Sequence, residues 1–154
     1  MRAPRFWKDH RNKFNLISKI LEPISWIWII LIRIRINRVK QKASVPTVCV
    51  GNINLGGVGK TPTVIAIAEK LKAMGHKPHI VSRGYGGKLK GPVLVSEKYN
   101  SEQVGDEPLL LSMVAPTWVS KDRMTGSRAA IENGCDVIIM DDGFQNGSLF
   151  KDLS

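Results

Sequence analysis

One stretch limits what this chain can fold into more than any other, namely residues 54–61, Asn-Leu-Gly-Gly-Val-Gly-Lys-Thr. It follows an apolar run at residues 47–50 and precedes a helix-like segment at residues 63–74. A strand, a glycine-rich turn and a helix in that order are typical of a phosphate-binding loop. Glycines let backbone N–H groups crowd around phosphate oxygens, and the helix points its positive end at the same place. The stretch therefore predicts a nucleotide site.

The polar residues of this loop have separate expected roles. Lys60 can reach the β- and γ-phosphates, and the Thr61 hydroxyl can join the coordination of Mg²⁺. Asn54 stands where the usual pattern has glycine, and asparagine tolerates left-handed backbone geometry better than most residues. The residues expected to bind the nucleotide are Asn54, Leu55, Gly56, Gly57, Val58, Gly59, Lys60 and Thr61.

The distribution of charge separates the chain into two parts. The 154 residues are enough for one domain with a core, and their formal net charge is +10. Residues 1–45 hold 11 Lys or Arg and 2 Asp or Glu, a net of +9, whereas residues 46–154 have a net of +1. We therefore expect an N-terminal arm over residues 1–45 and a nucleotide-binding domain over residues 46–154. Nucleic acid is not an expected partner, because Ile and Trp dominate the arm where polar residues would be needed.

The arm contains a nearly continuous apolar run at residues 24–32. The bases that follow it are Arg33, Arg35, Arg38, Lys40 and Lys42. The run is shorter than the roughly 20 apolar residues that a membrane span needs. Trp7, Trp26 and Trp28 are of the type that lies at the headgroup level, and the bases suit anionic lipid. We expect a helix or helical hairpin that lies in the inner leaflet without crossing it, with a buried helix packed on the domain as the alternative.

Strands and helices are expected to alternate along the rest of the chain. Strand patterns lie at residues 47–50, 77–81, 117–119 and 136–140, with a short edge hairpin at residues 92–95. Helix patterns lie at residues 63–74, 106–113 and 124–133, and residues 97–105 form a polar loop. This alternation predicts an α/β fold of the P-loop NTPase type, with a mostly parallel sheet flanked by helices. Ligands of such sheets bind outside the carboxyl ends of the strands.

Polar side chains follow several of the expected strands. Asp141 and Asp142 end the strand at residues 136–140, and carboxylates delivered beside a phosphate loop complete a Mg²⁺ site. Asp106 is expected to be either a helix cap or a catalytic base. Arg83 and Arg123 are expected to bind phosphate or to be solvated. The second half of a nucleotide site is therefore expected at these strand ends.

Four motifs carry a family resemblance. They are Gly51-Asn52-Ile53 with Gly56-Gly57-Val58-Gly59-Lys60-Thr61-Pro62, then Ser82-Arg83-Gly84-Tyr85-Gly86, Val104-Gly105-Asp106-Glu107-Pro108, and Asp141-Asp142-Gly143-Phe144-Gln145. In this order they resemble the tetraacyldisaccharide 4'-kinases, the lipid A 4'-kinases of Gram-negative bacteria. The resemblance implies a kinase, attached to the cytoplasmic face of the inner membrane, that uses ATP and Mg²⁺. It would transfer the γ-phosphate to the 4'-hydroxyl of lipid A disaccharide 1-phosphate.

The resemblance also implies roles for individual residues. The implied catalytic residues are Asp106 as the acid/base near the sugar hydroxyl, Lys60 and Asp142. The implied metal residues are Thr61, Asp141 and Asp142. Separately from the resemblance, Arg83, Tyr85, Glu107 and Arg123 are expected to contact the substrate. The sequence departs from the family at Asn146, where many members have histidine.

Members of the resembled family are longer than this chain, and two other functions share some of its sequence features. Members of the family continue for about as much chain again, so we expect this chain to be an N-terminal half whose cleft a missing C-terminal half completes. One rival is a membrane-attached ATPase switch, a class that usually has lysine where Asn54 stands. The other is a non-catalytic remnant that binds membrane through its arm.

Overall fold

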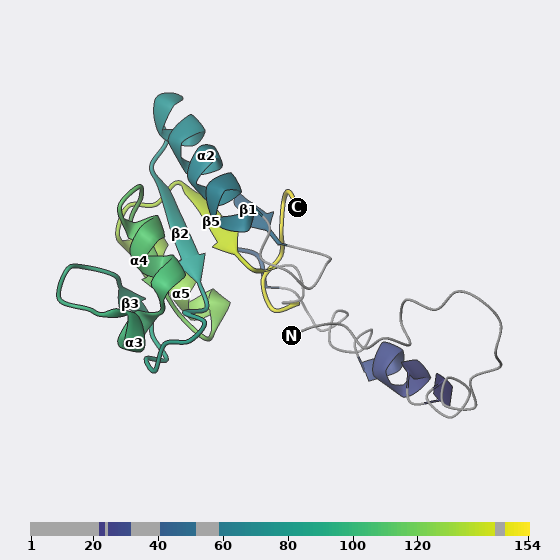
Figure 1. The fold of residues 1–154 in the computed structure, drawn as a ribbon. Helices are drawn as coiled ribbons and strands as arrows, with labels where there is room; N and C mark the ends of the chain where they lie inside the picture. The colour runs from purple at the N-terminus through teal and green to yellow at the C-terminus, as the bar shows by residue number, and fades with distance from the viewer. Residues whose placement is uncertain (1–21, 24, 32–40, 52–58, 144–146) are drawn as a thin grey trace. The chain divides into compact units, whose positions relative to one another are not determined.

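The computed structural model describes residues 22–23, 25–31, 41–51, 59–143 and 147–154. The chain divides into two compact units, Met1–Arg35 and Ile36–Ser154 (Figure 1). In the first unit, residues 22–23 and 25–31 are helical. Within the described parts of the chain, no helix has both the length and the apolar character needed to cross a membrane.

A single sheet forms the centre of the second unit, and its described strands follow the order β1-β5-β2-β4-β3. Their bounds are Thr47–Val50 for β1, Pro78–Ser82 for β2, Val93–Leu94 for β3, Thr117–Val119 for β4 and Val137–Asp141 for β5. The strands β1, β5, β2 and β4 run parallel, and β3 pairs antiparallel with β4 at the edge. The mostly parallel sheet that the sequence predicts is therefore confirmed.

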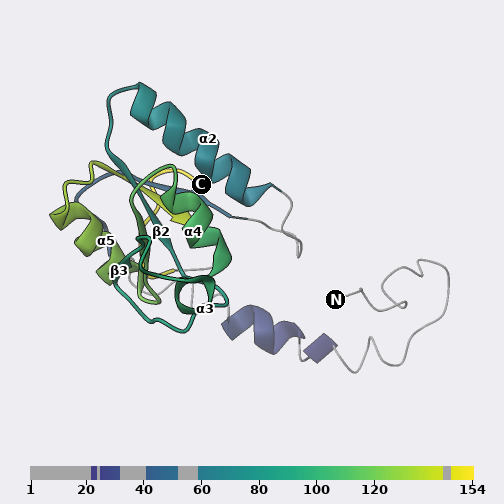
Figure 2. The same ribbon diagram turned by 60° about the vertical axis from the view of Figure 1, so that its left-hand side comes forward.

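Helices cover both faces of the sheet, as Figures 1 and 2 show. Their bounds are Lys60–Ala73 for α2, Ser101–Val104 for α3, Asp106–Ser112 for α4 and Arg123–Glu132 for α5. On one face, Val64 of α2 and Leu111 of α4 pack with Ile80 and Ile139 of the sheet. On the other face, Ala130 of α5 packs with residues that alternate with these along the strands, Val81, Ile138 and Met140. Both faces of β2 and β5 are therefore buried, which explains their continuous apolar runs.

Two details around α3 and α4 differ from the sequence analysis. The expected loop at residues 97–105 contains the short helix α3, whose start is closed by a capping box between Asn100 and Gln103, with two hydrogen bonds of 3.1 Å. The spacing Asn-x-x-Gln is the sequence signal of such a box. Asp106 is the first residue of α4, and its N-cap is Gly105, with a φ of 92°. A side chain on Gly105 would also approach the Tyr85 carbonyl oxygen to 2.5 Å, so glycine takes the cap position.

The outer edge of β1 is flanked by two segments that are distant in sequence. The Gln41 N–H donates to the Ser148 carbonyl at 2.9 Å, and the Phe150 N–H donates back to Gln41 at 2.8 Å. Ala43 and Leu149 are buried in the core on the α5 side of the sheet. Residues 41–45, which the sequence analysis included in the arm, thus pack within the second unit.

His79 in β2 is a buried group that is sensitive to acid. Its side chain is 7% exposed, and its Nδ1 accepts a hydrogen bond of 3.2 Å from Trp118 Nε1. Burial lowers the pKa of His79 below its ordinary value, against the opposite effect of Asp136. Because the unfolded chain takes up this proton more readily, stability is present above an unfolded-state pKa of about 6.5 and is lost as the pH falls through it.

We therefore expect the Tm to fall between about pH 7 and about pH 5, and to fall less in His79→Asn. The asparagine oxygen can accept the same hydrogen bond but does not titrate in this range. Thermal unfolding followed by circular dichroism at several pH values measures the slope for both proteins. Equal slopes would show that another group is responsible for the acid sensitivity.

Candidate functional site

The candidate site lies where the carboxyl ends of β1, β5 and β2 meet the start of α2. Gly51 follows β1, and Gly59, the N-cap of α2, has a φ of 86° in the left-handed region. Positive φ at this position is natural for glycine and starts the helix directly from the loop. The other loop residues for which nucleotide binding is predicted, Asn54, Leu55, Gly56, Gly57 and Val58, lie outside the described residues, as does Asn146.

Lys60 and Asp142 form an ion pair at the centre of the site. Lys60 Nζ lies 3.1 Å from Asp142 Oδ1, with the lysine side chain 17% exposed and the aspartate side chain 59% exposed. Asp142 has a φ of 54°, rare for a residue with a side chain, and its N–H donates to the Val50 carbonyl at 3.0 Å. This hydrogen bond ties the turn after β5 to β1. The structure thus brings together a loop lysine and a strand-end carboxylate that are far apart in sequence.

The charges around Lys60 keep it protonated. Burial alone would lower the pKa of Lys60, but the hydrogen bond to Asp142 and the nearby carboxylates of Asp142, Asp141 and Glu107 raise it above its ordinary value. A lysine in this state is a point positive charge with three donors. It can therefore bind an anion at the start of α2, where the helix N-terminus favours negative charge as well.

Asp141 is a buried carboxylate beneath this pair. It is 2% exposed, and its Oδ2 accepts a hydrogen bond of 3.0 Å from Ser82 Oγ at the end of β2. Burial raises the pKa of Asp141, while the Ser82 bond and the positive charges of Arg123 and Lys60 act in the opposite direction. Ser82 lies in one of the four motifs but was not among the expected site residues. Its position at the carboxyl end of a strand is the signal that could have identified it.

Arg123 lies under the site and does not face an open surface. It is 1% exposed, and its Nη1 donates to the Val81 carbonyl at 3.2 Å. Its Nη2 donates to the Asp141 carbonyl at 2.7 Å and to the Asp142 carbonyl at 3.5 Å. The sequence analysis expected Arg123 to contact phosphate or substrate, or else to be solvated. The structure instead uses its donors on the backbone, so Arg123 ties the ends of β2 and β5 together.

The loop after β2 packs against the start of α4. A side chain on Gly84 would lie 2.5 Å from Val119 Cγ1, so only glycine allows this close approach. Arg83 and Tyr85 are exposed on the loop, Tyr85 to 88%. The Tyr85 carbonyl lies directly beside Gly105. The Ser-Arg-Gly-Tyr-Gly and Val-Gly-Asp-Glu-Pro motifs are thereby brought together in space.

Asp106 and Glu107 form the first turn of α4 at this contact, and both are exposed. Partial burial and the negative charges of Asp141 and Asp142 raise the pKa of Glu107, while Lys60 lowers it. Glu107 therefore shares the electrostatic surroundings of the Lys60–Asp142 pair. The start of α4 completes a cluster of acidic groups around one lysine.

The oxygen atoms of this cluster suit a hard cation such as Mg²⁺ that also binds phosphate. In the described part of the chain, no group of three or more His, Cys, Asp or Glu residues could hold a metal ion by itself. Mg²⁺ does not need such a cage, because it is usually bound by one or two carboxylates together with water and substrate phosphates. Asp142, Asp141 and the half-buried Thr61 present carboxylate and hydroxyl oxygens of the required kind. The residues present therefore fit a Mg²⁺ ion that arrives with a nucleotide.

Comparison with known proteins identifies similar chains. The family model for tetraacyldisaccharide-1-P 4'-kinase, LpxK, matches residues 17–154. The tetraacyldisaccharide 4'-kinase of Parvibaculum lavamentivorans is 48% identical over 100% of this chain and 46% of its own length, and that of Paramagnetospirillum magneticum is 51% identical over 100% and 47%. The crystal structure of LpxK from Aquifex aeolicus in complex with ATP has a TM-score of 0.74 and 36% identity, covering 89% of this chain and 47% of that one. The chain spans about half the length of the curated relatives it matches.

Proposed function

This chain belongs to the tetraacyldisaccharide 4'-kinase family, and from that premise we propose that it forms the ATP-binding part of a lipid kinase. The reaction is transfer of the γ-phosphate of ATP to the 4'-hydroxyl of lipid A disaccharide 1-phosphate. The observation that carries the proposal is the Lys60–Asp142 pair of 3.1 Å at the start of α2, near the buried Asp141. A binding module for an uncharged ligand would have no use for this arrangement.

The nucleotide half of the mechanism follows from charge and position. Phosphoryl transfer needs alignment and charge neutralisation more than covalent chemistry by the protein. Lys60 would bind the β- and γ-phosphates, with residues 54–59 and the N-terminus of α2 around them. Thr61, Asp141 and Asp142 would hold Mg²⁺, which neutralises phosphate charge when bound. Ser82 and Arg123 would hold Asp141 in place through its carboxylate and its backbone carbonyl.

The acceptor half places the sugar near the start of α4. Asp106 would accept the proton of the 4'-hydroxyl, because a carboxylate within hydrogen-bond reach of the hydroxyl can act as a general base. Arg83, Tyr85 and Glu107 would contact the disaccharide. The relatives extend beyond the part that this chain matches, so we propose that their second half supplies the remainder of the lipid cleft.

A transfer assay tests this function. The chain is incubated with Mg²⁺, γ-labelled ATP and lipid A disaccharide 1-phosphate in mixed micelles, alone and with the second half of the Parvibaculum lavamentivorans relative. We expect labelled lipid in at least one preparation, and a loss of about 10²–10⁴-fold in Asp106→Asn with ATP binding retained. Glu132→Gln, an exposed change in α5, is the matched control. ATP binding without transfer in either preparation would instead assign the chain to the ATPase switches.

We propose that the arm attaches the protein to anionic lipid at the cytoplasmic face of the inner membrane. The described helical residues of the first unit expose a set of large apolar side chains, Trp26, Ile27, Trp28, Ile29, Ile30 and Leu31. Tryptophan suits the headgroup level, and an amphipathic or apolar segment beside basic residues binds lipid through both effects. An enzyme whose acceptor stays in the bilayer gains access to it in this way.

Vesicle binding tests the arm. Changing Arg33, Arg35 and Arg38 together to glutamine is expected to weaken binding to anionic vesicles by about 1 kcal/mol per charge. The control is a triple change to glutamine at exposed lysines of the domain, Lys77, Lys90 and Lys98. It alters the net charge by the same amount. Co-sedimentation with vesicles of increasing anionic lipid content measures the partition. Equal losses in the two triple variants would show that overall charge, rather than the arm, is responsible.

A further inference from the structure

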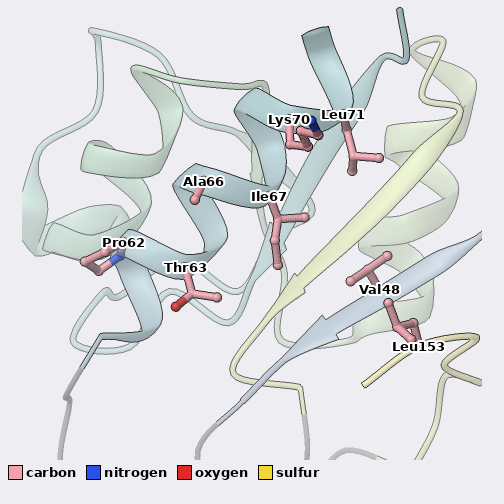
Figure 3. Close-up of a pocket in the computed structure, with 8 residues that line it drawn as sticks. All are labelled: Val48, Pro62, Thr63, Ala66, Ile67, Lys70, Leu71 and Leu153. Atoms are coloured by element: carbon pink, nitrogen blue, oxygen red, sulfur yellow. The ribbon is translucent and has the colours of Figure 1, made fainter. Parts of the chain in front are cut away.

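A groove beside α2 does not suit the metal ion that the proposed reaction needs (Figure 3). Its described lining residues are mostly apolar, and Figure 3 shows the side chains of Ile67 and Leu153 along it. The Thr63 hydroxyl in this lining donates to the Gly59 carbonyl at 2.7 Å, and Lys70 adds a positive charge. A hard cation binds carboxylate and carbonyl oxygens instead. Metal binding therefore belongs to the carboxylates at the strand ends.

The buried carboxylate of Asp141 does not have both of its oxygens available. Ser82 Oγ donates to Asp141 Oδ2 at 3.0 Å, and both side chains are buried. A serine hydroxyl has a single proton, so this bond uses the whole donor capacity of Ser82. Among the residues that the structure describes, none donates a hydrogen bond to the other oxygen, Oδ1. Asp141 thus has one oxygen bound to Ser82 and one left for a ligand.

Backbone contacts fix the direction of the Ser82 hydroxyl. Ser82 is the last residue of β2, and its carbonyl accepts from the Ser120 N–H at 2.9 Å. The Gly84 N–H donates to Ser82 Oγ at 3.4 Å, which directs the hydroxyl proton toward the carboxylate. Gly84 has a φ of 67° and lies where a side chain would meet Val119, so this turn is held by packing. The hydroxyl is therefore held in place by the turn after β2.

The backbone of Asp141 is fixed as well. Asp141 pairs with Val50 in the parallel ladder between β5 and β1, and Arg123 Nη2 donates to the Asp141 carbonyl at 2.7 Å. With its backbone held on both sides, the carboxylate can change direction only through its side-chain rotamer. The bond from Ser82 opposes such a change, because a hydrogen bond to a carboxylate is stronger than one between neutral groups. Asp141 therefore presents its remaining oxygen in one direction.

We propose that Ser82 makes Asp141 a ligand through one oxygen only, and thereby gives the site a preference for Mg²⁺ over Ca²⁺. Mg²⁺ requires near-ideal octahedral geometry and few protein ligands, which one oxygen in a fixed direction suits. Ca²⁺ takes 6–8 oxygen ligands and often uses both oxygens of a carboxylate. The bond to Ser82 withholds the second oxygen. Ser82 is a positioning residue, since it acts through Asp141, and the inference rests on the proposed nucleotide site.

Metal-nucleotide binding tests this preference. Calorimetric titrations measure how tightly the chain, alone and with the second half of the Parvibaculum lavamentivorans relative, binds the Mg²⁺ and Ca²⁺ complexes of a non-hydrolysable ATP analogue. The ratio of the two affinities is the metal preference. In Ser82→Ala we expect this ratio to fall by about tenfold or more, the usual effect of removing a group that orients a metal ligand. Ser82→Thr keeps the hydroxyl and should keep the preference.

Ser120→Ala is the matched control. Ser120 is also a buried serine at the end of a strand, but its hydroxyl donates to the Asp122 carbonyl and not to a carboxylate. We expect its ratio to stay within about twofold of that of the unchanged chain. Circular dichroism checks that each variant is folded. If Ser82→Ala does not fold, Ser82→Val takes its place beside Ser82→Thr, because valine has nearly the shape of threonine without the hydroxyl.

Two results would overturn the role of Ser82. One is an unchanged ratio in Ser82→Ala, or an equal loss for both complexes, which would leave Ser82 as a structural partner of a buried carboxylate. The other is a fall of the same size in Ser120→Ala, which would assign the effect to loosening of the strand ends.

Lys60→Ala in the same titrations separates these failures from failure of the proposed function. If this variant binds both complexes as tightly as the unchanged chain, the nucleotide site is wrong and the inference fails with it. If it binds weakly while Ser82→Ala keeps the ratio, only the role of Ser82 is refuted.

Discussion

Replacing Lys60 with alanine is expected to weaken Mg-ATP binding by about ten- to a hundredfold, because a hydrogen bond to a charged group is worth about 1.5–3 kcal/mol. In a preparation that transfers phosphate, the rate should fall by about 10²–10³-fold, as when other positioned electrostatic groups are removed. Lys60 is the protonated group at the start of α2, and its partner Asp142 is 59% exposed. Because the aspartate of this pair is largely solvated, the pair contributes on the order of 1 kcal/mol to stability, so the variant should stay folded.

Lys70→Ala is the matched control for this experiment. It removes the same charge from the same helix, about three turns away from the site, where Lys70 is exposed. Isothermal titration calorimetry with Mg-ATP measures the affinity of each protein, and thermal unfolding checks the fold. Similar affinities for the two variants would remove Lys60 from the nucleotide site and, with it, the central observation behind the proposed function.

Replacing Arg123 with methionine should destabilise the domain by about 3–5 kcal/mol, the largest effect on stability that we expect at one position. The buried guanidinium donates to the carbonyls of Val81, Asp141 and Asp142. An acceptor left buried without a partner costs about 1–3 kcal/mol, and the nearby Asp141 would lose a neighbouring positive charge. Since a domain of this size is stable by only about 5–15 kcal/mol, urea unfolding should detect the loss easily.

Arg123→Lys separates support of the site from support of the whole fold. Lysine keeps the charge but offers a single ammonium in place of the planar guanidinium, so it cannot meet the same carbonyls together. We expect a smaller loss of stability with a clear loss of Mg-ATP affinity. Arg128→Met changes an exposed arginine of the same helix and should alter neither quantity. Full affinity in Arg123→Lys would mean that Arg123 supports the fold without arranging the strand ends at the site.

The position of Arg123 explains why local patterns misjudge such residues. A positively charged residue between a strand and a helix is predicted from sequence to bind phosphate. Its burial depends on α5 covering the sheet on the side where Val81 and Met140 pack. Only the order β1-β5-β2 brings the ends of β2 and β5 together, and that order joins segments about 60 residues apart. Hydrogen bonds over such separations leave no local signal in the sequence.

Helix starts show a similar limit. Asp106 follows a loop and lies two residues before Pro108, which favours the interpretation of a cap. The cap is Gly105, because close contact with the Tyr85 backbone leaves no room for a side chain there. Asn100 and Gln103, in contrast, form a capping box that local spacing alone could have predicted. One of these differences was therefore decided by tertiary contact, and the other was a missed sequence pattern.

The sequence by itself determined the order of strands and helices, the mostly parallel sheet and the family. Apolar periodicity, glycine positions and the four motifs are local, and they follow directly from backbone geometry. Only the tertiary structure decided that Lys60 pairs with Asp142, that Ser82 binds the buried Asp141 and that Arg123 lies beneath both. It also decided that residues 152–153 hydrogen-bond along the outer edge of β1. These contacts depend on strand order and packing, through which residues distant in sequence meet at one edge of the sheet.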